Sequence, residues 1–323
     1  MIENQDLNPF IGLRSFEKNE SHLFFGREKQ IQEVISSLGN SGFTAIIGSS
    51  GSGKSSLIKS GIIPSIESGA FKGEGNGWKI GVLNPGYDPI NNLSTCLSSG
   101  EFINNNSKDV SNILRTSKDG ISAVLKDASN ENPQNVLLII DQFEEIFSFA
   151  NNENAHPNGK SDSLLFINLL LNTLIEKRIY IALSMRSDYL ENCTHFSGLP
   201  EALNKGQYLI PRMTREELKR VITKPIELIN AKISPSLLDV LLNHVDDNQD
   251  LLPVLQHGLM RVVDFWQRES KSQGPIDIEH YNAIGTLDKA LSNHADEAYI
   301  ELETVENKLI TELIFKSLAE KGS

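Results

Sequence analysis

The sequence predicts an α/β fold, a parallel sheet covered by helices on both faces, followed by an all-helical region. Four short β-branched apolar runs alternate with helical patterns in the first part of the chain. Near-continuous apolar runs of this kind are typical of strands buried on both faces. After about residue 211 the strand signals become few and helical patterns follow one another. The 323 residues are enough for about two or three domains.

The expected strands are 44–48, 79–84, 135–141 and 179–186. The helical patterns between them cover 27–38, 54–66 and 163–178. Further helices are expected at 214–228, 234–245 and 251–270, and the first has a capping-box signature in Thr214 and Glu217. Two more amphipathic patterns cover 289–303 and 306–323. Because Ser323 comes soon after a helix, we expect the sequence to end inside a third domain.

The composition limits the ligands and the cellular location that can be expected. Net charge is -12, so we expect no direct binding to nucleic acid and no attraction to anionic lipid. The two cysteines, Cys96 and Cys193, are far apart, which favours a reducing compartment over a disulfide or zinc site. The polar N-terminus does not resemble a signal peptide, and no apolar stretch approaches the about 18 residues that span a bilayer. The expected location is the cytoplasm, without membrane insertion.

The segment "GSSGSGKS" matches the phosphate-loop pattern G-x-x-x-x-G-K-[ST], after a predicted strand and before a predicted helix. Backbone N–H groups of such a loop and the helix N-terminus bind phosphates. Lys54 should reach the β- and γ-phosphates, Ser55 should bind Mg²⁺, and Ser56 should meet the α-phosphate. The alternative is a Gly/Ser-rich linker that matches by chance. The predicted nucleotide-binding residues here are Gly48, Ser49, Ser50, Gly51, Ser52, Gly53, Lys54, Ser55 and Ser56.

Two further polar residues end predicted strands. A buried carboxylate such as Asp141 needs a cation or hydrogen bonds to compensate its burial, and Mg²⁺ beside Ser55 would supply that compensation. Arg186 ends a later strand, where its charge could sense the γ-phosphate. The alternatives are a helix-capping aspartate and an arginine in a surface ion pair. Since no guanine-reading N-K-x-D sequence occurs, ATP is favoured over GTP as the ligand.

The residues also carry a family resemblance. The blocks "NPFIGLRSFEKNESHLFFGREKQIQEV", "IIGSSGSGKSSLIKSGIIPSI", "VLNPGYDP", "LLIIDQFEEIF", "LSMRSDYL" and "LLPVLQHGLM" resemble, in this order, the novel-STAND class of signal-transduction ATPases, relatives of the NACHT and NB-ARC proteins. The resemblance implies a P-loop NTPase core, a helical domain and a winged helix. It places a lead-in with the adenine-side motif at 1–40, the core at 41–211, the helical domain at 212–286 and a truncated winged helix at 287–323.

The same resemblance implies further site residues. Many ATPases place the catalytic glutamate directly after the metal-binding aspartate, but here Gln142 and Phe143 come first. NACHT-type relatives have an acidic pair three and four residues later, which matches Glu144 and Glu145. We expect Glu144 to be the base, although one or both glutamates could simply favour the start of a helix.

Residues outside the core strands complete the implied site. By resemblance, Phe25, Gly26 and Arg27 lie near the adenine, and Pro253 closes over the nucleotide. The alternatives are a core role for the phenylalanine and a proline tolerated at the first turn of a helix.

The resemblance implies a switch that hydrolyses ATP slowly, closed with ADP and open with ATP. Its expected cofactors are ATP or ADP and Mg²⁺. Its expected partners are other copies in the ATP state, and sensor or effector parts outside this chain, in bacterial signalling or antiphage defence. The competing functions are a remodelling motor of the AAA+ kind and a scaffold that binds ATP without turnover. No persuasive arginine finger supports the motor.

Overall fold

A computed structural model describes residues 8–71, 77–99, 102, 106–127, 134–150, 159–246, 251–269 and 273–320. The described chain divides into two compact units. One is Ser15–Met213, and the other combines the residues before Ser15 with those from Thr214 onward.

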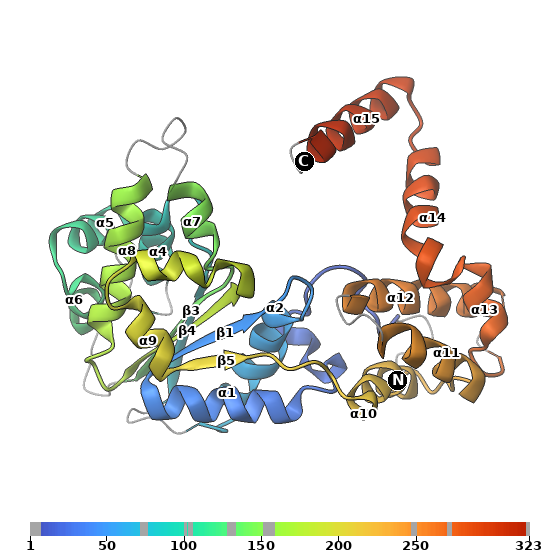
Figure 1. Cartoon of the computed structure of the whole chain (residues 1–323), viewed down its shortest axis with the longest axis horizontal. Coiled ribbons are helices and arrows are strands. Elements are labelled where there is room, and N and C mark those ends of the chain that lie inside the picture. Colours follow the sequence, from blue (N-terminus) through green and yellow to red (C-terminus); the bar gives the residue numbers. More distant parts are fainter. Residues whose placement is uncertain are drawn as a thin grey trace. The chain divides into compact units, whose positions relative to one another are not determined.

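The first unit contains a five-stranded sheet in the order β2-β3-β4-β1-β5 (Figure 1). All four strand pairs are parallel. The strands are β1 (Phe43–Gly48), β2 (Trp78–Leu83), β3 (Asn135–Ile140), β4 (Ile179–Arg186) and β5 (Gln207–Leu209). The four strand predictions are confirmed to within one residue at each end. β5 was not predicted, because it has only three residues and none of them is buried.

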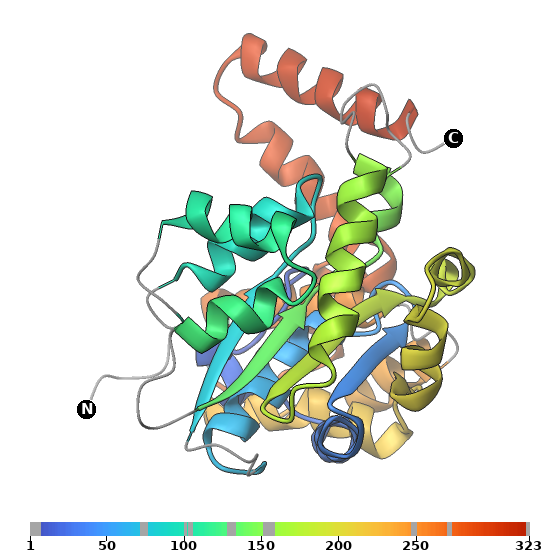
Figure 2. The same cartoon turned by 90° about the vertical axis from the view of Figure 1, so that its left-hand side faces the viewer.

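Helices cover both faces of the sheet, which confirms the predicted α/β class (Figure 2). Along β1, Ala45 and Ile47 pack on one face while Ile46 packs on the other. The first face is covered by apolar residues of α4 to α9, and the second by those of α1, η3 and α3. Strands β1 and β3 are buried at every residue, as their continuous apolar runs require.

The helices of this unit have the following bounds: η2 (Lys18–Leu23), α1 (Glu28–Ser41), α2 (Lys54–Ser56), η3 (Leu57–Ile62), α3 (Ile63–Glu67), α4 (Pro89–Leu97), α5 (Ser107–Thr116), α6 (Gly120–Asp127), α7 (Glu145–Ala150), α8 (Gly159–Thr173), η4 (Ser187–Tyr189), η5 (Glu191–His195) and α9 (Leu199–Lys205). The helix predicted at 54–66 is one continuous element with a π-helical turn, η3, in its middle. Such π-turns are rare and often lie at functional sites.

The second unit is helical, as predicted. Its helices are α10 (Arg215–Leu228), α11 (Pro235–Asp246), α12 (Leu252–Glu269), α13 (Ile278–Ala283), α14 (Thr286–Ile300) and α15 (Val305–Glu320). Thr214 and Glu217 form the predicted capping box, in which each side chain bonds the backbone N–H of the other residue. The assignment of 287–323 to a winged helix stays a prediction. Its last three residues lie outside the described residues.

The N-terminal segment packs within this helical unit. The Asn8 side chain donates to Met260 O at 2.8 Å and to Asp264 Oδ1 at 2.7 Å. Residues 1–7 of the predicted lead-in lie outside the described residues. The domain boundaries proposed from the sequence stay predictions.

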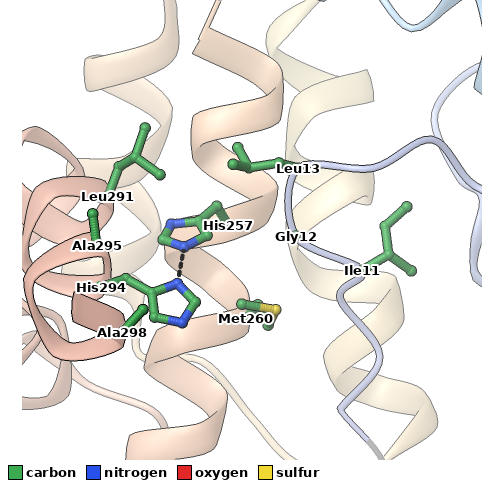
Figure 3. A pocket seen from close by; sticks show the side chains of 9 residues that line it. All are labelled: Ile11, Gly12, Leu13, His257, Met260, Leu291, His294, Ala295 and Ala298. Atoms are coloured by element: carbon green, nitrogen blue, oxygen red, sulfur yellow. Dashed lines mark hydrogen bonds between the residues drawn. The ribbon is translucent and has the colours of Figure 1, made fainter. Parts of the chain in front are cut away.

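A cavity of about 300 Å³ lies between α12, α14 and the segment 11–13 of the second unit (Figure 3). In it, His257 Nε2 and His294 Nδ1 lie 2.8 Å apart and share a hydrogen bond. The His257 ring is 2% exposed, and burial, followed by His294 and Arg261, lowers its pKa. In the described part of the chain, no helix combines the length and apolarity that crossing a membrane requires.

Candidate functional site

The predicted site residues of the first unit gather at the carboxyl edge of the sheet. In the register of β1 and β4, Gly48 is paired with Arg186, so the phosphate loop begins beside the arginine. β3 lies on the other side of β4, and its last residue Ile140 pairs with Leu183. Asp141 therefore leaves the sheet at the same edge. Ligands of open α/β sheets bind at this edge.

The phosphate loop wraps around its own lysine. Gly51 and Gly53 have positive φ angles of 75° and 87°, which glycine adopts without a steric penalty. The Lys54 ammonium donates to Gly48 O at 3.0 Å and to Ser49 O at 2.7 Å. Burial lowers the pKa of Lys54, while the carboxylates of Glu144 and Asp141 act in the opposite direction. The loop thus holds one cation where backbone N–H groups can surround a phosphate.

Ser55 and Asp141 bring together two oxygen ligands of a kind that suits Mg²⁺. Ser55 Oγ donates to Asp141 Oδ1 at 3.0 Å, and the carboxylate is only 4% exposed. Hydroxyl and carboxylate oxygens suit Mg²⁺, which keeps several ligands from water and phosphate. The buried Ser52 Oγ in the same loop has no hydrogen-bond partner among the described residues. The residues present therefore fit a nucleotide with its metal ion.

The chain turns sharply directly after Asp141. Gln142 has a φ of 55°, which is uncommon for a residue other than glycine. Its backbone N–H donates to Asp141 Oδ1 at 3.1 Å and to Ser184 Oγ at 3.0 Å. Its side chain accepts a bond of 3.0 Å from Asn84. This turn directs the following glutamates away from the line of β3.

The two glutamates have different surroundings. Glu144 Oε2 accepts a bond of 3.3 Å from the backbone N–H of Arg186, and its charge acts on Lys54. Glu145 Oε2 accepts a bond of 3.0 Å from Gly86 N, in the loop that follows β2. Burial raises the pKa of Glu145, and the bond from Gly86 opposes that shift. Glu144 therefore belongs with the phosphate loop and Arg186, whereas Glu145 joins two loops.

Arg186 lies at the edge of this group. Its guanidinium is paired with Asp188 and lies 6.0 Å from the centre of the Tyr189 ring. The Nε atom is buried without a hydrogen-bond partner among the described residues. The side chain is 42% exposed.

Of the residues predicted to lie near the adenine, Arg27 contacts the phosphate loop. The Arg27 guanidinium is buried and donates to Pro211 O at 2.9 Å and, more weakly, to Ser52 O at 3.5 Å. Gly26 has a φ of 83°, and Phe25 is half-buried.

The contacts described above do not include two other predicted residues. Ser56 is buried, and its hydroxyl accepts a bond of 3.2 Å from Phe16 N, which ties the lead-in to the phosphate-loop helix. Pro253 is the second residue of α12, in the other unit. The roles of Ser56 and Pro253 stay predictions.

Sequence reasoning missed Ser184 and the contact partners of Gln142 and Glu145. Ser184 is a polar residue inside an apolar strand and two positions before Arg186, which places both on one face of β4. That exception to the apolar pattern was the available signal.

A parallel sheet with a phosphate loop at its carboxyl edge defines a P-loop NTPase. The sequence model of the Novel STAND NTPase 1 family matches residues 9–323, and the chain therefore belongs to this family. This confirms the resemblance described above.

Solved structures share the fold at low sequence identity. The Walker-type ATPase PABY2304 of Pyrococcus abyssi has a TM-score of 0.51 and 13% identity, over 95% of this chain and 78% of that chain. The ADP form of the Aeropyrum pernix ORC2 protein has a TM-score of 0.52 and 12% identity, over 90% and 71% of the two chains. The S. cerevisiae Hsp104:casein complex has a TM-score of 0.51 and 17% identity, over 88% and 44%. A comparison with curated proteins finds no match.

Proposed function

We propose that this NTPase is a slow, nucleotide-controlled switch that binds ATP with Mg²⁺ at the carboxyl edge of its sheet. The observation that carries the proposal is the contact between Ser55 and Asp141, with Glu144 and Lys54 beside it. Ser55 and Asp141 would hold the metal ion, which supplies positive charge to the phosphates. Lys54 would exchange its bonds to Gly48 and Ser49 for bonds to the β- and γ-phosphates. ATP rather than GTP is the proposed ligand.

In the proposed hydrolysis, Glu144 is the general base. A water oxygen attacks the γ-phosphorus, the bond from that phosphorus to the β–γ bridging oxygen breaks, and Glu144 accepts the proton of the water. Arg186 would stabilise the charge that develops on the γ-phosphate. General-base help contributes about 10²- to 10⁴-fold to such a step.

Two contacts support a slow rate. Glu144 accepts a hydrogen bond from the backbone of Arg186, and the Arg186 guanidinium is held by Asp188. The Arg186 guanidinium would have to leave Asp188 before it could bind the γ-phosphate, and one oxygen of Glu144 is already bonded to the backbone. A long-lived ATP state suits a protein whose conformation depends on the bound nucleotide, because the ligand shifts the population only while it stays bound.

The switch would be closed with ADP and open with ATP, and the open form would associate with other copies. We place it in the bacterial cytoplasm, in signalling or antiphage defence, with sensor or effector parts outside residues 1–323. The competing functions are a remodelling motor and a scaffold without turnover. The likeness to Hsp104 concerns the fold alone, at 17% identity, and does not favour the motor.

Turnover measurements on the purified protein distinguish these functions. We expect Mg²⁺-dependent ATP binding in calorimetry, a single-turnover rate well below that of a motor, and a larger mass in light scattering with ATP than with ADP. Rapid steady-state turnover would favour the motor, and binding without turnover the scaffold. Absence of nucleotide binding would refute the proposal.

A further inference from the structure

We propose that Ser184 is a positioning residue that fixes both the metal-binding carboxylate of Asp141 and the turn at Gln142. The inference rests on the proposed function and deepens it. It identifies a single hydroxyl in β4 that sets the geometry of two functional groups following β3.

The Ser184 side chain is buried and fully engaged. It is 1% exposed and lies between the buried apolar residues Leu183 and Met185. Its hydroxyl donates to Asp141 Oδ1 and accepts from Gln142 N at 3.0 Å. A serine hydroxyl has one hydrogen to donate and two lone pairs, so it can make both bonds at once. A buried hydroxyl is costly without such partners.

The first consequence concerns Asp141. Its Oδ1 accepts from Ser55 Oγ, from Ser184 Oγ and from Gln142 N. No described residue donates to Oδ2. Three donors on one oxygen fix the plane of the carboxylate and leave the second oxygen without a protein partner among the described residues. Partners that orient a metal ligand in this way typically change metal affinity or activity about 10–100-fold when removed.

The second consequence concerns Glu144. The left-handed backbone of Gln142 is unfavourable for a residue with a side chain, so surrounding bonds must hold it. Ser184 contributes two of these: its hydroxyl accepts from Gln142 N, and its carbonyl accepts from Phe143 N at 2.9 Å. The backbone N–H of Arg186, on the same side of β4, donates to Glu144 Oε2. Hydrogen bonds from the end of β4 therefore hold the segment from Asp141 to Glu144 in place.

The test compares Ser184→Ala with Ser184→Thr and with Thr44→Val. Threonine keeps the hydroxyl and suits a strand. Thr44 is a matched control, because its hydroxyl is fully buried in a strand and donates to Ser37 Oγ at 3.1 Å, away from the site. All variants are measured by ADP binding in EDTA, by Mn²⁺ titration of the ADP complex with electron paramagnetic resonance, and by single-turnover ATP hydrolysis.

We expect Ser184→Ala to bind ADP in EDTA within about twofold of wild type. Its Mn²⁺ affinity and its single-turnover rate should each fall about 10–100-fold. Ser184→Thr should retain most of the wild-type Mn²⁺ affinity and most of the wild-type single-turnover rate. Thr44→Val should leave both near wild type, even if its melting temperature falls. These results would support the positioning role.

Two results would overturn the inference. In one, Ser184→Ala changes Mn²⁺ affinity and rate no more than Thr44→Val does. In the other, it weakens ADP binding in EDTA as much as Mn²⁺ binding, which indicates general damage to the site. If wild type shows no metal-dependent nucleotide binding, the proposed function fails and the inference fails with it. Normal wild-type binding with an unaffected Ser184→Ala variant refutes the inference alone.

Discussion

The hydroxyl of Ser55 donates to Oδ1 of Asp141 at 3.0 Å, although 86 positions separate the two residues. The first follows the phosphate-loop lysine, and the second follows β3. The sheet order brings them together, because β4 lies between β1 and β3 and all three strands point the same way. This contact joins the proposed phosphate-binding and metal-binding parts of the site, and the first two predictions separate those parts.

Lys54→Ala should weaken ATP binding about 10–100-fold, with or without Mg²⁺, because a charged hydrogen bond to phosphate is worth about 1.5–3 kcal/mol. Calorimetric titration with ATP measures the loss. Lys59→Ala is the matched control, since Lys59 lies in the same helical element and pairs with Glu17 at 2.8 Å on the surface. That variant should bind ATP normally. Equal affinities for Lys54→Ala and wild type would remove the phosphate-loop assignment.

Asp141→Asn should affect only the metal-dependent part of binding. The asparagine oxygen can still accept from Ser55 and Ser184, so the local fold should persist, but the negative charge is lost. We expect near-normal ATP binding in EDTA and little gain when Mg²⁺ is added. Asp162→Asn serves as a control, since that carboxylate pairs with Arg115 on the surface of the same unit. A normal response of Asp141→Asn to Mg²⁺ would contradict the assignment.

Most of the sheet and the phosphate loop were predictable because their signals are local. The four predicted strands are apolar runs, and the loop has fixed spacing between a strand and a helix. β5 was not predicted, because it has three residues and none of them is buried. α4 was missed although Asp88 caps it by accepting from Asn91 N and Pro89 occupies its first turn. Both are usual signals of a helix start.

The role of Ser184 could not be predicted in the same way. A serine in a strand acquires meaning only when the neighbouring strands are known, and the order of strands does not follow from hydrophobic periodicity. Placing β4 next to β3 sets Ser184 beside Asp141 and Gln142. The different surroundings of Glu144 and Glu145 also depend on the turn at Gln142. Because both residues are glutamates and are adjacent, the sequence alone does not distinguish them.

A third prediction concerns pH and the second unit. Burial, followed by the charges of His294 and Arg261, lowers the pKa of His257 below its ordinary value of 6.5. As pH falls through this value, the unfolded chain binds the proton first, so the free energy of unfolding decreases. The decrease in the free energy of unfolding begins near pH 6.5 and continues down to the lower pKa of His257 in the folded form. At most it amounts to about 1.4 kcal/mol per pH unit for one proton.

The measurement is urea unfolding at pH 7.5 and at pH 5.5, about one unit on either side of the ordinary histidine value. Trp266, buried in the same helix as His257, gives the fluorescence signal in a Trp78→Phe background. His257→Gln should make the free energy of unfolding less dependent on pH than in the parent protein. An unchanged pH dependence would show that His257 does not contribute to it.

The final prediction separates the two glutamates. Glu144 shares its surroundings with Lys54 and Arg186, whereas Glu145 is bonded to Gly86. Glu144→Gln keeps the size of the side chain but cannot accept a proton from water. ATP should therefore still bind, while single-turnover hydrolysis falls about 100-fold or more. Because ATP then persists, light scattering should show a longer-lived assembly than in wild type.

Glu145→Gln is the matched control for that variant. Glutamine can still accept from Gly86 N, so the loop contact should persist, and a carboxylate at the start of α7 is worth only about 0.3–1 kcal/mol. Hydrolysis by Glu145→Gln should stay within a few-fold of wild type. If Glu145→Gln abolishes hydrolysis and Glu144→Gln does not, the base is the second glutamate. If neither variant affects the rate, neither glutamate is the base, and the proposed role of this acidic pair in hydrolysis is wrong.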